Sequence, residues 1–575
     1  MEIWVHPLVL IWELEPLFNL LILNNMKYNL KHILVVSTLI LFSTSCSKKI
    51  DEAYANPNYD TKAAPELMLP QIVASMAGNY GGHGPLNDAR YIGAYIQNFA
   101  FSNTNSNFDR MGYTNSAADV AQSTWRTHYY DIGQNNVRMI EWAVENKQWD
   151  YAGVGKAVFA WSWLNLTTYF GDVILKDAFN TSLATFKYDT QEEVYAEVRK
   201  NCYEALSYLN KTGDNASQAN LAKGDSYFYN GDVNKWKKFV YGILARSHNH
   251  ISNKSIYKAD SVIYYTNLAM KETADDAMVK FAATALGATN NFFGPFRANF
   301  GGTGITAPTA LRQSAFIANL MSGINTAFPG VKDPRAIYLL RLNNNKTFKG
   351  VEPNKGQTAL AVGDRPENLH GISQFTGASN ITPPNDLNCR FIFRNNSPIP
   401  VITATEVAFM RAEAFYLKGD KANALVAYKD AIGKHFDMLT TYYNTNVPTA
   451  DIINATVKAN FLADTKVVPT NANDLTLSMI MLQKYIALWG HGTFETWTDM
   501  RRYHYVDLDK TTGKQVYTDF IAPSGIGLFE DNGGKLVYRM RPRFNSEYLW
   551  NIVELTRIGA TQLDYHTKEQ WFSQK

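Results

Sequence analysis

The feature that most constrains the fold is a periodic stretch from residue 406 to 433, EVAFMRAEAFYLKGDKANALVAYKDAIG. Small side chains recur at Ala412 and Ala424, rings recur at Phe415 and Tyr428, and Gly419 separates the two halves. Small residues let two antiparallel helices approach closely, rings fill the space between them, and a glycine permits the tight turn. The stretch therefore predicts a helical hairpin.

The spacing is that of a tetratricopeptide repeat, which cannot bury its apolar face alone, so other helix pairs must stack on it. Three less regular pairs have the required helical periodicity. They are expected at residues 155–173 with 192–209, 233–247 with 257–271, and 475–492 with 494–506. Two further helices are expected at 65–77 and 117–144. The sequence thus predicts a mainly α fold with repeat helices at about 149–272 and 401–505.

Helical periodicity lapses between residues 283 and 399, where glycine and asparagine are frequent. An insertion of this length inside a helical array is uncommon and usually functional. We therefore expect a loop-rich side with minor β structure, and we expect ligand contacts to come from it.

The N-terminal segment has the pattern of an export signal. Two lysines follow Met26, and the apolar residues of 33–42 form a core of about ten residues, which suits a signal peptide and is too short to span a bilayer. We interpret 26–45 as the signal peptide. Residues 1–25, which contain Glu13, Glu15 and two prolines, are interpreted as an over-called upstream start and are excluded from the fold.

The signal ends in Ser43-Thr44-Ser45-Cys46, which resembles a bacterial lipobox with serine in place of the usual apolar residue. A lipobox cysteine carries acyl chains, and two or more chains hold a protein stably on a membrane. We therefore predict lipidation of Cys46 and a single mature domain over 46–575. A plain secretory signal with an incidental cysteine is the alternative.

Charge and cysteine content exclude some classes of protein. The formal net charge of +3 is spread along the chain, which argues against a nucleic-acid surface. Besides Cys46 the chain has only Cys202 and Cys389, too few for a disulfide scaffold. Cys202 falls on a predicted helix face as a small core residue. A bridge between Cys202 and Cys389 is disfavoured but stays open.

Motifs for catalysis, metals and cofactors are missing from the sequence. It contains no H-E-x-x-H and no G-x-S-x-G, so we expect no metal site and no cofactor. The enzymatic candidate is the pair Glu495 and Asp499, four residues apart, which could serve as the acid and base of a glycosidase. Arg501 and Arg502 follow directly, so we favour an ion-pair network between helices.

Two loops combine aromatic rings with amide side chains, a composition suited to stacking on sugars and binding their hydroxyls. Aromatic residues make up 13% of the chain and charged residues only 19%. Rings in these loops can instead fill a small core beneath them. The candidate ligand-binding residues are Phe101, Phe108, Tyr113, Phe292, Phe293, Phe296 and Phe300.

Landmarks in order along the chain resemble the SusD/RagB family of nutrient-binding outer-membrane lipoproteins, and more closely its SusD-like branch. They are NPNYDTKAAPELMLP, STWRTHYYDIGQNN, AVFAWSWLNLTTYFGDV, NGDVNKWKKFVYGILARS, Asp333-Pro334-Arg335, EVAFMRAEAFYLKG, LQKYIALWG with ETWTDMRR, and RPRFNSEYLWN. Each segment alone is modest evidence, and the ordered set is specific.

The resemblance implies a mostly helical fold with four tetratricopeptide-like units on one side and a loop-rich region on the other. It implies a lipid-anchored protein on the surface of the outer membrane that captures oligosaccharide or peptide and delivers it to a SusC-type TonB-dependent transporter without catalysis. A surface glycosidase and a peptide-binding repeat scaffold are the alternatives. No ligand residue is matched to the family one for one.

Overall fold

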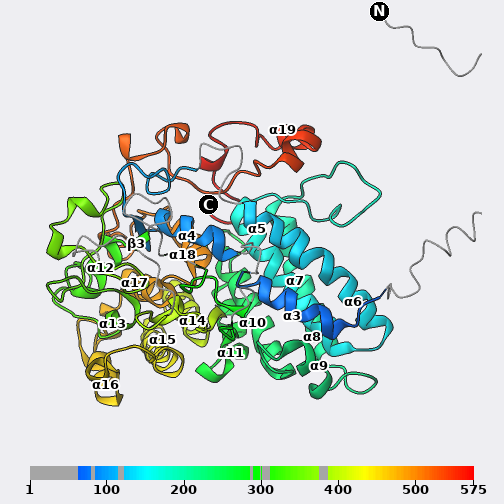
Figure 1. Ribbon diagram of the computed structural model, residues 1–575, viewed down its shortest axis with the longest axis horizontal. Coiled ribbons are helices and arrows are strands. Elements are labelled where there is room, and N and C mark those ends of the chain that lie inside the picture. The colour runs from blue at the N-terminus through cyan, green and yellow to red at the C-terminus, as the bar shows by residue number, and fades with distance from the viewer. Residues whose placement is uncertain are drawn as a thin grey trace, which may run out of the picture. The chain divides into compact units, whose positions relative to one another are not determined.

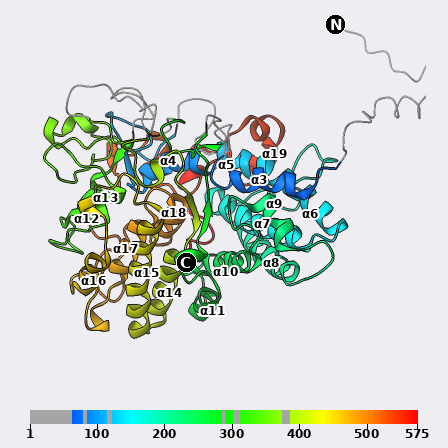
Figure 2. The same cartoon turned by 60° about the horizontal axis from the view of Figure 1, so that its bottom comes forward.

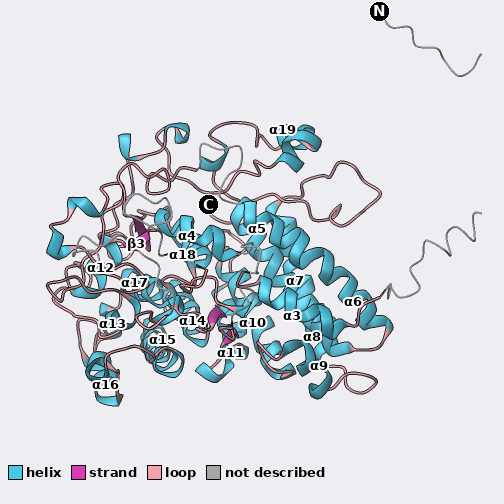
Figure 3. Cartoon of the chain, in the orientation of Figure 1, coloured by secondary structure: helices cyan, strands magenta, loops and turns pink. Residues whose placement is uncertain are grey.

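The computed structural model describes residues 62–78, 85–113, 122–284, 289–297, 300, 311–373 and 386–575. The chain divides into two units, Met1–Ala63 and Ala64–Lys575, and the second contains every element described below. Helices dominate this unit and strands are few (Figure 3). The prediction of a mainly α fold is confirmed.

The longer helices are α3 (Pro65–Ser75), α4 (Pro85–Tyr95), α6 (Asn135–Glu145), α7 (Trp149–Phe170), α8 (Gln191–Leu209), α9 (Gln218–Asp225), α10 (Val233–Asn249), α11 (Ala259–Leu268), α12 (Ala315–Ser322), α14 (Ala404–Lys418), α15 (Lys421–Tyr442), α16 (Ala455–Ala463), α17 (Leu477–Leu488) and α18 (Thr493–Arg502). Shorter segments are α5 (Gln122–Arg126), α13 (Ala336–Leu339), α19 (Ile552–Arg557) and the π-helical turns η1 (Thr127–Gln134) and η11 (Ser546–Trp550). Figure 1 shows their order along the chain.

The predicted tetratricopeptide hairpin is formed by α14 and α15. Gly419 separates them in the left-handed conformation with φ 88°, which a glycine adopts without strain. Ala412, Ala424 and Tyr428 are fully buried, as the repeat pattern requires. The pairs α7 with α8, α10 with α11, and α17 with α18 occupy the other predicted positions.

The helix predicted at 117–144 differs from the structure. Its described part is α5, η1 and α6, three consecutive segments in which the middle one has π-helical hydrogen bonding. Helix α4, which the sequence did not predict, precedes them. The widened turn of η1 shifts the register of side chains between α5 and α6.

Two small antiparallel sheets tie the loop-rich region to the helices. Strand β2 (Ala277–Val279) pairs with β4 (Ile399–Ile402), so the long insertion begins and ends at one sheet. Strand β1 (Phe99–Phe101) pairs with β3 (Leu311–Gln313), which joins the insertion to the segment after α4. The two aromatic loops predicted from the sequence are therefore brought close together.

The repeat helices and the loops occupy different sides of the unit. In Figure 2, α11, α14, α15 and α16 lie toward the bottom, whereas α4, α5 and α19 lie toward the top, and Figure 1 agrees. Side-chain chemistry for a ligand is therefore sought on the side formed by the long insertion and the segments that follow β1 and α18.

The structure settles the two cysteines that it describes. Cys202 on α8 and Cys389 are both buried and both free. Burial raises the pKa of the Cys389 thiol to about 12, so this thiol is not a nucleophile at neutral pH. Cys46 and the predicted signal peptide lie outside the described residues. Within the described ranges, no helix combines the length and the apolar content needed to cross a bilayer.

Candidate functional site

A cleft of about 540 Å³ opens on the loop-rich side. Four chain segments line it, within residues 97–109, 315–325, 352–355 and 519–527. The second of these is α12 with the turn after it, which gives the cleft one regular wall. A volume of this size suits a ligand of a few linked sugar rings or a short peptide.

Hydrogen bonds between the segments fix the shape of the cleft. Nε2 of Gln97 donates to the carbonyl oxygen of Ile521 over 2.7 Å, and Nδ2 of Asn325 donates to that of Thr518 over 2.9 Å. Asp519 accepts from the backbone N–H of Thr326 at 2.6 Å. These bonds connect walls far apart in sequence, so the cleft is formed before a ligand arrives.

A polar group that is free to bind a ligand lies on α12. Asn319 is half-buried, and its side-chain amide makes no hydrogen bond to any described residue. An amide can both donate to and accept from a sugar hydroxyl or a peptide group. Ile521 and Ile324 add apolar surface, with 80% and 62% of their side chains exposed. The cleft therefore offers hydrogen bonding beside apolar contact.

Asp109 lies beneath the cleft in an unusual electrostatic state. Its carboxylate accepts backbone N–H bonds from Phe101 at 3.2 Å and from Asn354 at 2.8 Å. Burial nevertheless raises the pKa of Asp109 to about 7, because desolvation outweighs the two backbone bonds. The residue thus holds the loop after β1 against the 352–355 segment.

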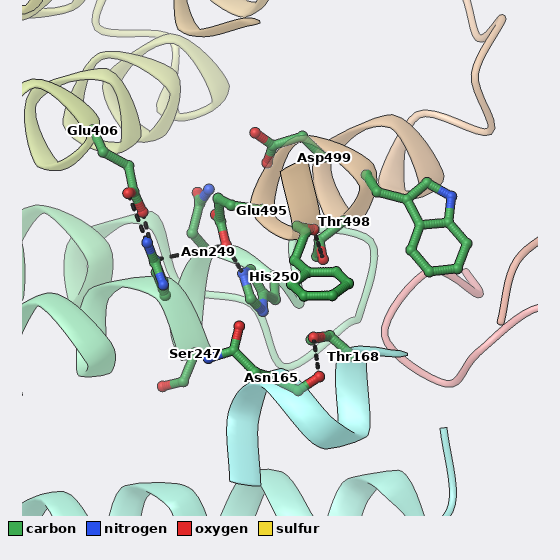
Figure 4. Close-up of polar contacts among 12 residues, drawn as sticks. Asn165, Thr168, Ser247, Asn249, His250, Glu406, Glu495, Thr498 and Asp499 are labelled. Carbon is green, nitrogen blue, oxygen red and sulfur yellow. Dashed lines mark hydrogen bonds and ion pairs between the residues drawn. The ribbon is translucent and has the colours of Figure 1, made fainter. Parts of the chain in front are cut away.

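The carboxylate pair Glu495 and Asp499 lies on α18, inside the helical part of the unit (Figure 4). Their side chains are 6% and 2% exposed. His250 contacts Glu495 at 2.9 Å, and Nζ of Lys484 lies 2.7 Å from Asp499 and 3.4 Å from Glu495. Burial alone would raise the pKa of Glu495, but His250, Lys484 and Arg246 hold it well below its ordinary range.

Neighbouring charges extend this pair into a buried network. Arg502 contacts Asp499 at 2.5 Å and Glu413 at 2.7 Å, so α18 is joined to α14. Arg246 on α10 binds Glu406 on α14 through both carboxylate oxygens. The network joins four of the repeat helices, α10, α14, α17 and α18, and the predicted structural role of the carboxylates is confirmed. Buried and paired with cations, they cannot reach a substrate bond.

Within the described ranges, no group of three or more His, Cys, Asp or Glu side chains is placed so that it could hold a metal ion.

A family model described as SusD-like, starch-binding associating with outer membrane, matches residues 57–523. The chain belongs to the SusD-like family. The matched range contains every helix from α3 to α18, and it ends within residues 519–527, the last segment that lines the cleft.

Solved structures show the same fold. A SusD/RagB family protein from Bacteroides thetaiotaomicron VPI-5482 is 19% identical with a TM-score of 0.63, covering 89% of this chain and 99% of that chain. A SusD homolog from Bacteroides fragilis NCTC 9343 is 15% identical with a TM-score of 0.64, and a chitin-binding protein is 20% identical with a TM-score of 0.60; for both, the match covers 89% of this chain and 100% of the other. Comparison with curated protein sequences gives no match.

In this SusD-like chain the rings of the first aromatic loop are buried, which is the alternative that the sequence left open. Phe101, Phe108 and Tyr113 are only 1%, 8% and 7% exposed. Phe108 stacks between Phe101 and Tyr91, with ring centroids 5.3 and 4.4 Å away. Tyr113 packs instead against Phe529 and His566, with ring centroids 4.9 and 5.8 Å away. Packing against other rings removes the apolar surface of all three from water.

Most rings of the second loop are also buried. Phe292, Phe293 and Phe300 are at most 1% exposed, and Phe300 packs edge-on against Phe293 at 4.3 Å. Phe296 is the exception, with 49% exposure and its backbone N–H bonded to Asn395. Of the seven predicted ligand-binding rings, only Phe296 presents a large surface that a ligand could contact without rearrangement.

The polar residues that line the cleft were missed in the sequence. Asn319 follows the same helical spacing as its core neighbours, and Asp519 sits in a turn, so neither carries a motif. One usable signal was the run of isoleucine, proline and glycine at 521–527, which is apolar yet too turn-rich for a core element.

Proposed function

We propose that this SusD-like protein captures an oligosaccharide at the cell surface and delivers it, chemically unchanged, to a SusC-type TonB-dependent transporter in the outer membrane. The family description, starch-binding associating with outer membrane, supports a glycan ligand and this location. The chitin-binding relative is a second glycan binder of the same fold. A peptide ligand is the alternative within the same function.

The observation that carries the proposal is the preformed cleft with its free amide. Asn319 offers a donor and an acceptor, and the adjacent Ile324 and Ile521 offer apolar surface to the C–H faces of a sugar. Binding requires such a surface, and it does not require a catalytic acid and base pair with shifted pKa values beside the ligand. Glu495 and Asp499, which could have formed one, are instead neutralised inside the helical core.

Membrane attachment through Cys46 belongs to the same proposal. Lipidation there would tether the helical unit by a segment that precedes α3, the first described helix. A tether on the mature N-terminus keeps the protein next to a transporter in the same membrane and raises the effective concentration of one for the other.

The test uses the purified full-length protein and isothermal titration calorimetry with maltoheptaose and a chitin hexasaccharide. Asn319→Ala should weaken binding by roughly tenfold, the effect of losing a good ligand hydrogen bond. Asn210→Ala is the matched control, because Asn210 is exposed at the end of α8 and lies outside the cleft. Its affinity should equal that of the unaltered protein.

Chromatography of the same mixtures over a day should recover the oligosaccharides intact. Equal affinity for the Asn319→Ala variant and the unaltered protein would show that the ligand does not bind in the cleft. Shortened chains in the eluate would show that the protein hydrolyses its ligand. If only peptides from a parallel panel bind, the ligand class is wrong while the cleft is retained. Copurification with a large outer-membrane barrel tests the partner.

A further inference from the structure

A second cavity, of about 490 Å³, lies away from the cleft and is lined by a different part of the chain. Its walls come from α5, η1 and α6 on one side, the loop 174–186 on another, and η11 on a third. No residue lines both cavities. The proposed capture function does not use this pocket.

Four aromatic side chains line the pocket: Trp125, Tyr129, Phe179 and Phe186. The Trp125 and Tyr129 rings lie 4.8 Å apart and are tilted by 54°, and those of Tyr129 and Phe179 lie 6.3 Å apart and are tilted by 53°. Rings tilted against one another form a concave box, unlike the flat platform that stacks on a sugar face. Such boxes recognise ammonium groups through the negative faces of the rings.

The backbone is strained where it places one of these rings. Phe179 has φ 65°, a left-handed conformation that is a true outlier for a bulky residue. The ring reaches Gly133 of η1, where a Cβ would lie 2.4 Å from its Cζ atom. Strain of this kind persists where the surrounding structure enforces it and is concentrated at ligand sites.

Both π-helical turns in the described residues contribute to this one pocket. Tyr129 and Gln134 come from η1, and Ser546 and Glu547 come from η11. A π-helical turn is less stable than an α-helical one and is found frequently at functional sites. Side-chain bonds hold the walls in place, because Asn551 bonds both the N–H and the carbonyl of Phe186, at 3.1 and 2.9 Å.

A buried carboxylate completes the box. Glu547 is 4% exposed and accepts hydrogen bonds at Oε2 from Tyr188 at 2.8 Å and from Asn551 at 3.0 Å. Its other oxygen, Oε1, has only a 3.3 Å contact from the Ser546 hydroxyl, and no Lys or Arg of the described chain forms an ion pair with it. A buried carboxylate with one oxygen this weakly bonded and no cationic partner can accept a cation from a ligand.

The charges around the pocket point the same way. Burial raises the pKa of Tyr129 well above its ordinary value, and the carboxylates of Glu547 and Asp189 raise it further. Glu141 and Arg138 lie at the rim, and both are exposed, so water screens their charges more than that of Glu547. Of the charged residues that line the pocket, Glu547 is therefore the only buried one.

We propose that this pocket, enclosed by Trp125, Tyr129, Phe179 and Phe186 with the carboxylate of Glu547, binds an organic ammonium group. An amino sugar and a lysine side chain both carry this group. The ammonium would lie against the ring faces and donate to Oε1 of Glu547, which gives the buried carboxylate its missing counter-charge.

Calorimetry on the full-length protein with choline chloride and its neutral isostere 3,3-dimethylbutan-1-ol tests the charge requirement. Choline should bind at least about tenfold more tightly than the alcohol, because only the cation is attracted by the ring faces and by the charge of Glu547. Its trimethylammonium group has no N–H, so the hydrogen bond to Oε1 is tested by the two amines that follow. Two further titrations, with the glucosamine disaccharide and with Nα-acetyl-lysine methylamide, distinguish the two sources. Tighter binding of one than of choline identifies the source.

Variants test the residues. Glu547→Gln keeps the size of the side chain and removes its charge, and it should weaken choline binding about tenfold. Phe179→Gly removes a wall and relieves the positive φ, so the fold is kept while binding is lost. Glu554→Gln is the matched control: this glutamate is close in sequence, pairs with Arg557 and does not line the pocket.

Equal affinities for choline and the neutral alcohol would overturn the proposal, as would undiminished binding by Glu547→Gln. The proposal would also be overturned if choline and both amines failed to bind at concentrations of about 10 mM. Asn319→Ala should leave choline binding unchanged, which separates this site from the glycan cleft.

Discussion

Substitution of Lys484 by methionine tests whether the buried network joins the repeat helices. Lys484 lies on α17, is 1% exposed, and places its Nζ 2.7 Å from Asp499 and 3.4 Å from Glu495. Burial alone would lower the pKa of this lysine, but the carboxylates of Asp499 and Glu495 raise it above its ordinary value. The lysine is therefore charged at neutral pH, and methionine fills a similar volume without the charge.

The expected cost follows from what is left behind. Methionine leaves Asp499 with Arg502 alone and leaves Glu495 with His250 and a 3.7 Å contact to Arg246. Removing one partner of a buried pair costs about 3–5 kcal/mol, because the remaining charge stays desolvated. Unfolding entropy for a unit of this length is about 1 kcal/mol per kelvin, so the melting temperature should fall by about 3–5 °C.

Differential scanning calorimetry of the full-length protein measures this change. Lys418→Met is the matched control, because its ion pair with Asp260 lies at the surface with 46% and 74% exposure and is worth at most about 1 kcal/mol. A Lys484→Met variant that melts within one degree of the control would refute the reasoning. In that case water or rearranged side chains must neutralise the two carboxylates.

Three further outcomes are expected. Asp109→Asn should flatten the pH dependence of the unfolding free energy. The pKa of Asp109 is about 7 in the fold against 3.8 unfolded, so its stabilising contribution is full below pH 4 and is lost, by up to about 4 kcal/mol, as pH rises through 7. Thermal melts between pH 4 and 8 measure this, and an unchanged pH slope would contradict it. Gly350→Ala should lower the unfolding free energy by about 1–3 kcal/mol, since its Cβ would lie 1.9 Å from the backbone oxygen of Ser314. Gly433→Ala in helix α15, where the nearest atom to the new Cβ is 3.6 Å away, should raise it by about 0.5–1 kcal/mol. Equal melting temperatures for the two variants would show that the backbone at residue 350 moves to accept the methyl group. Cys46→Ser should move the protein from salt-washed membranes to the soluble fraction, and a variant still bound to membranes would remove lipidation from the proposal.

The helical part was predictable because its packing repeats. Ala412, Gly419 and Tyr428 each occupy a position that the hairpin geometry dictates, and the same periodicity located α7, α8, α10 and α17. Helix α4 was missed because it is short and carries Asn87, Asp88 and Gly93, which have weak helical propensity. It is stabilised by tertiary contacts, since Asp88 accepts bonds from Thr124 at the start of the next helical region.

The sites were much less predictable, and the aromatic loops show why. The local sequence around a phenylalanine among glycine and asparagine residues is the same whether its ring faces water or packs against a neighbouring ring. Phe108 and Phe300 find partners in Tyr91 and Phe99, which pair with them only after the chain has folded. Composition located loops rich in aromatic rings, whereas the choice between ligand contact and core depended on long-range packing that no local pattern records.

The two cavities differ in the chemistry that they offer, and this difference bears on how the protein selects its cargo. The cleft offers a free amide beside exposed isoleucines, so it suits a polar chain with apolar faces. The pocket has four aromatic rings and a buried carboxylate without a cation, so it favours a cationic ligand. A cargo that engages both would combine their binding energies through one molecule and gain affinity without any new contact in the cleft. For a cargo that engages both, the double variant Asn319→Ala with Glu547→Gln should lose binding free energy for an amino-sugar oligomer equal to the sum of the two single losses, because distant contacts to one ligand add. If each cavity instead binds its own ligand, the intact cavity still binds the oligomer in each single variant, and only the double variant should lose most of the binding.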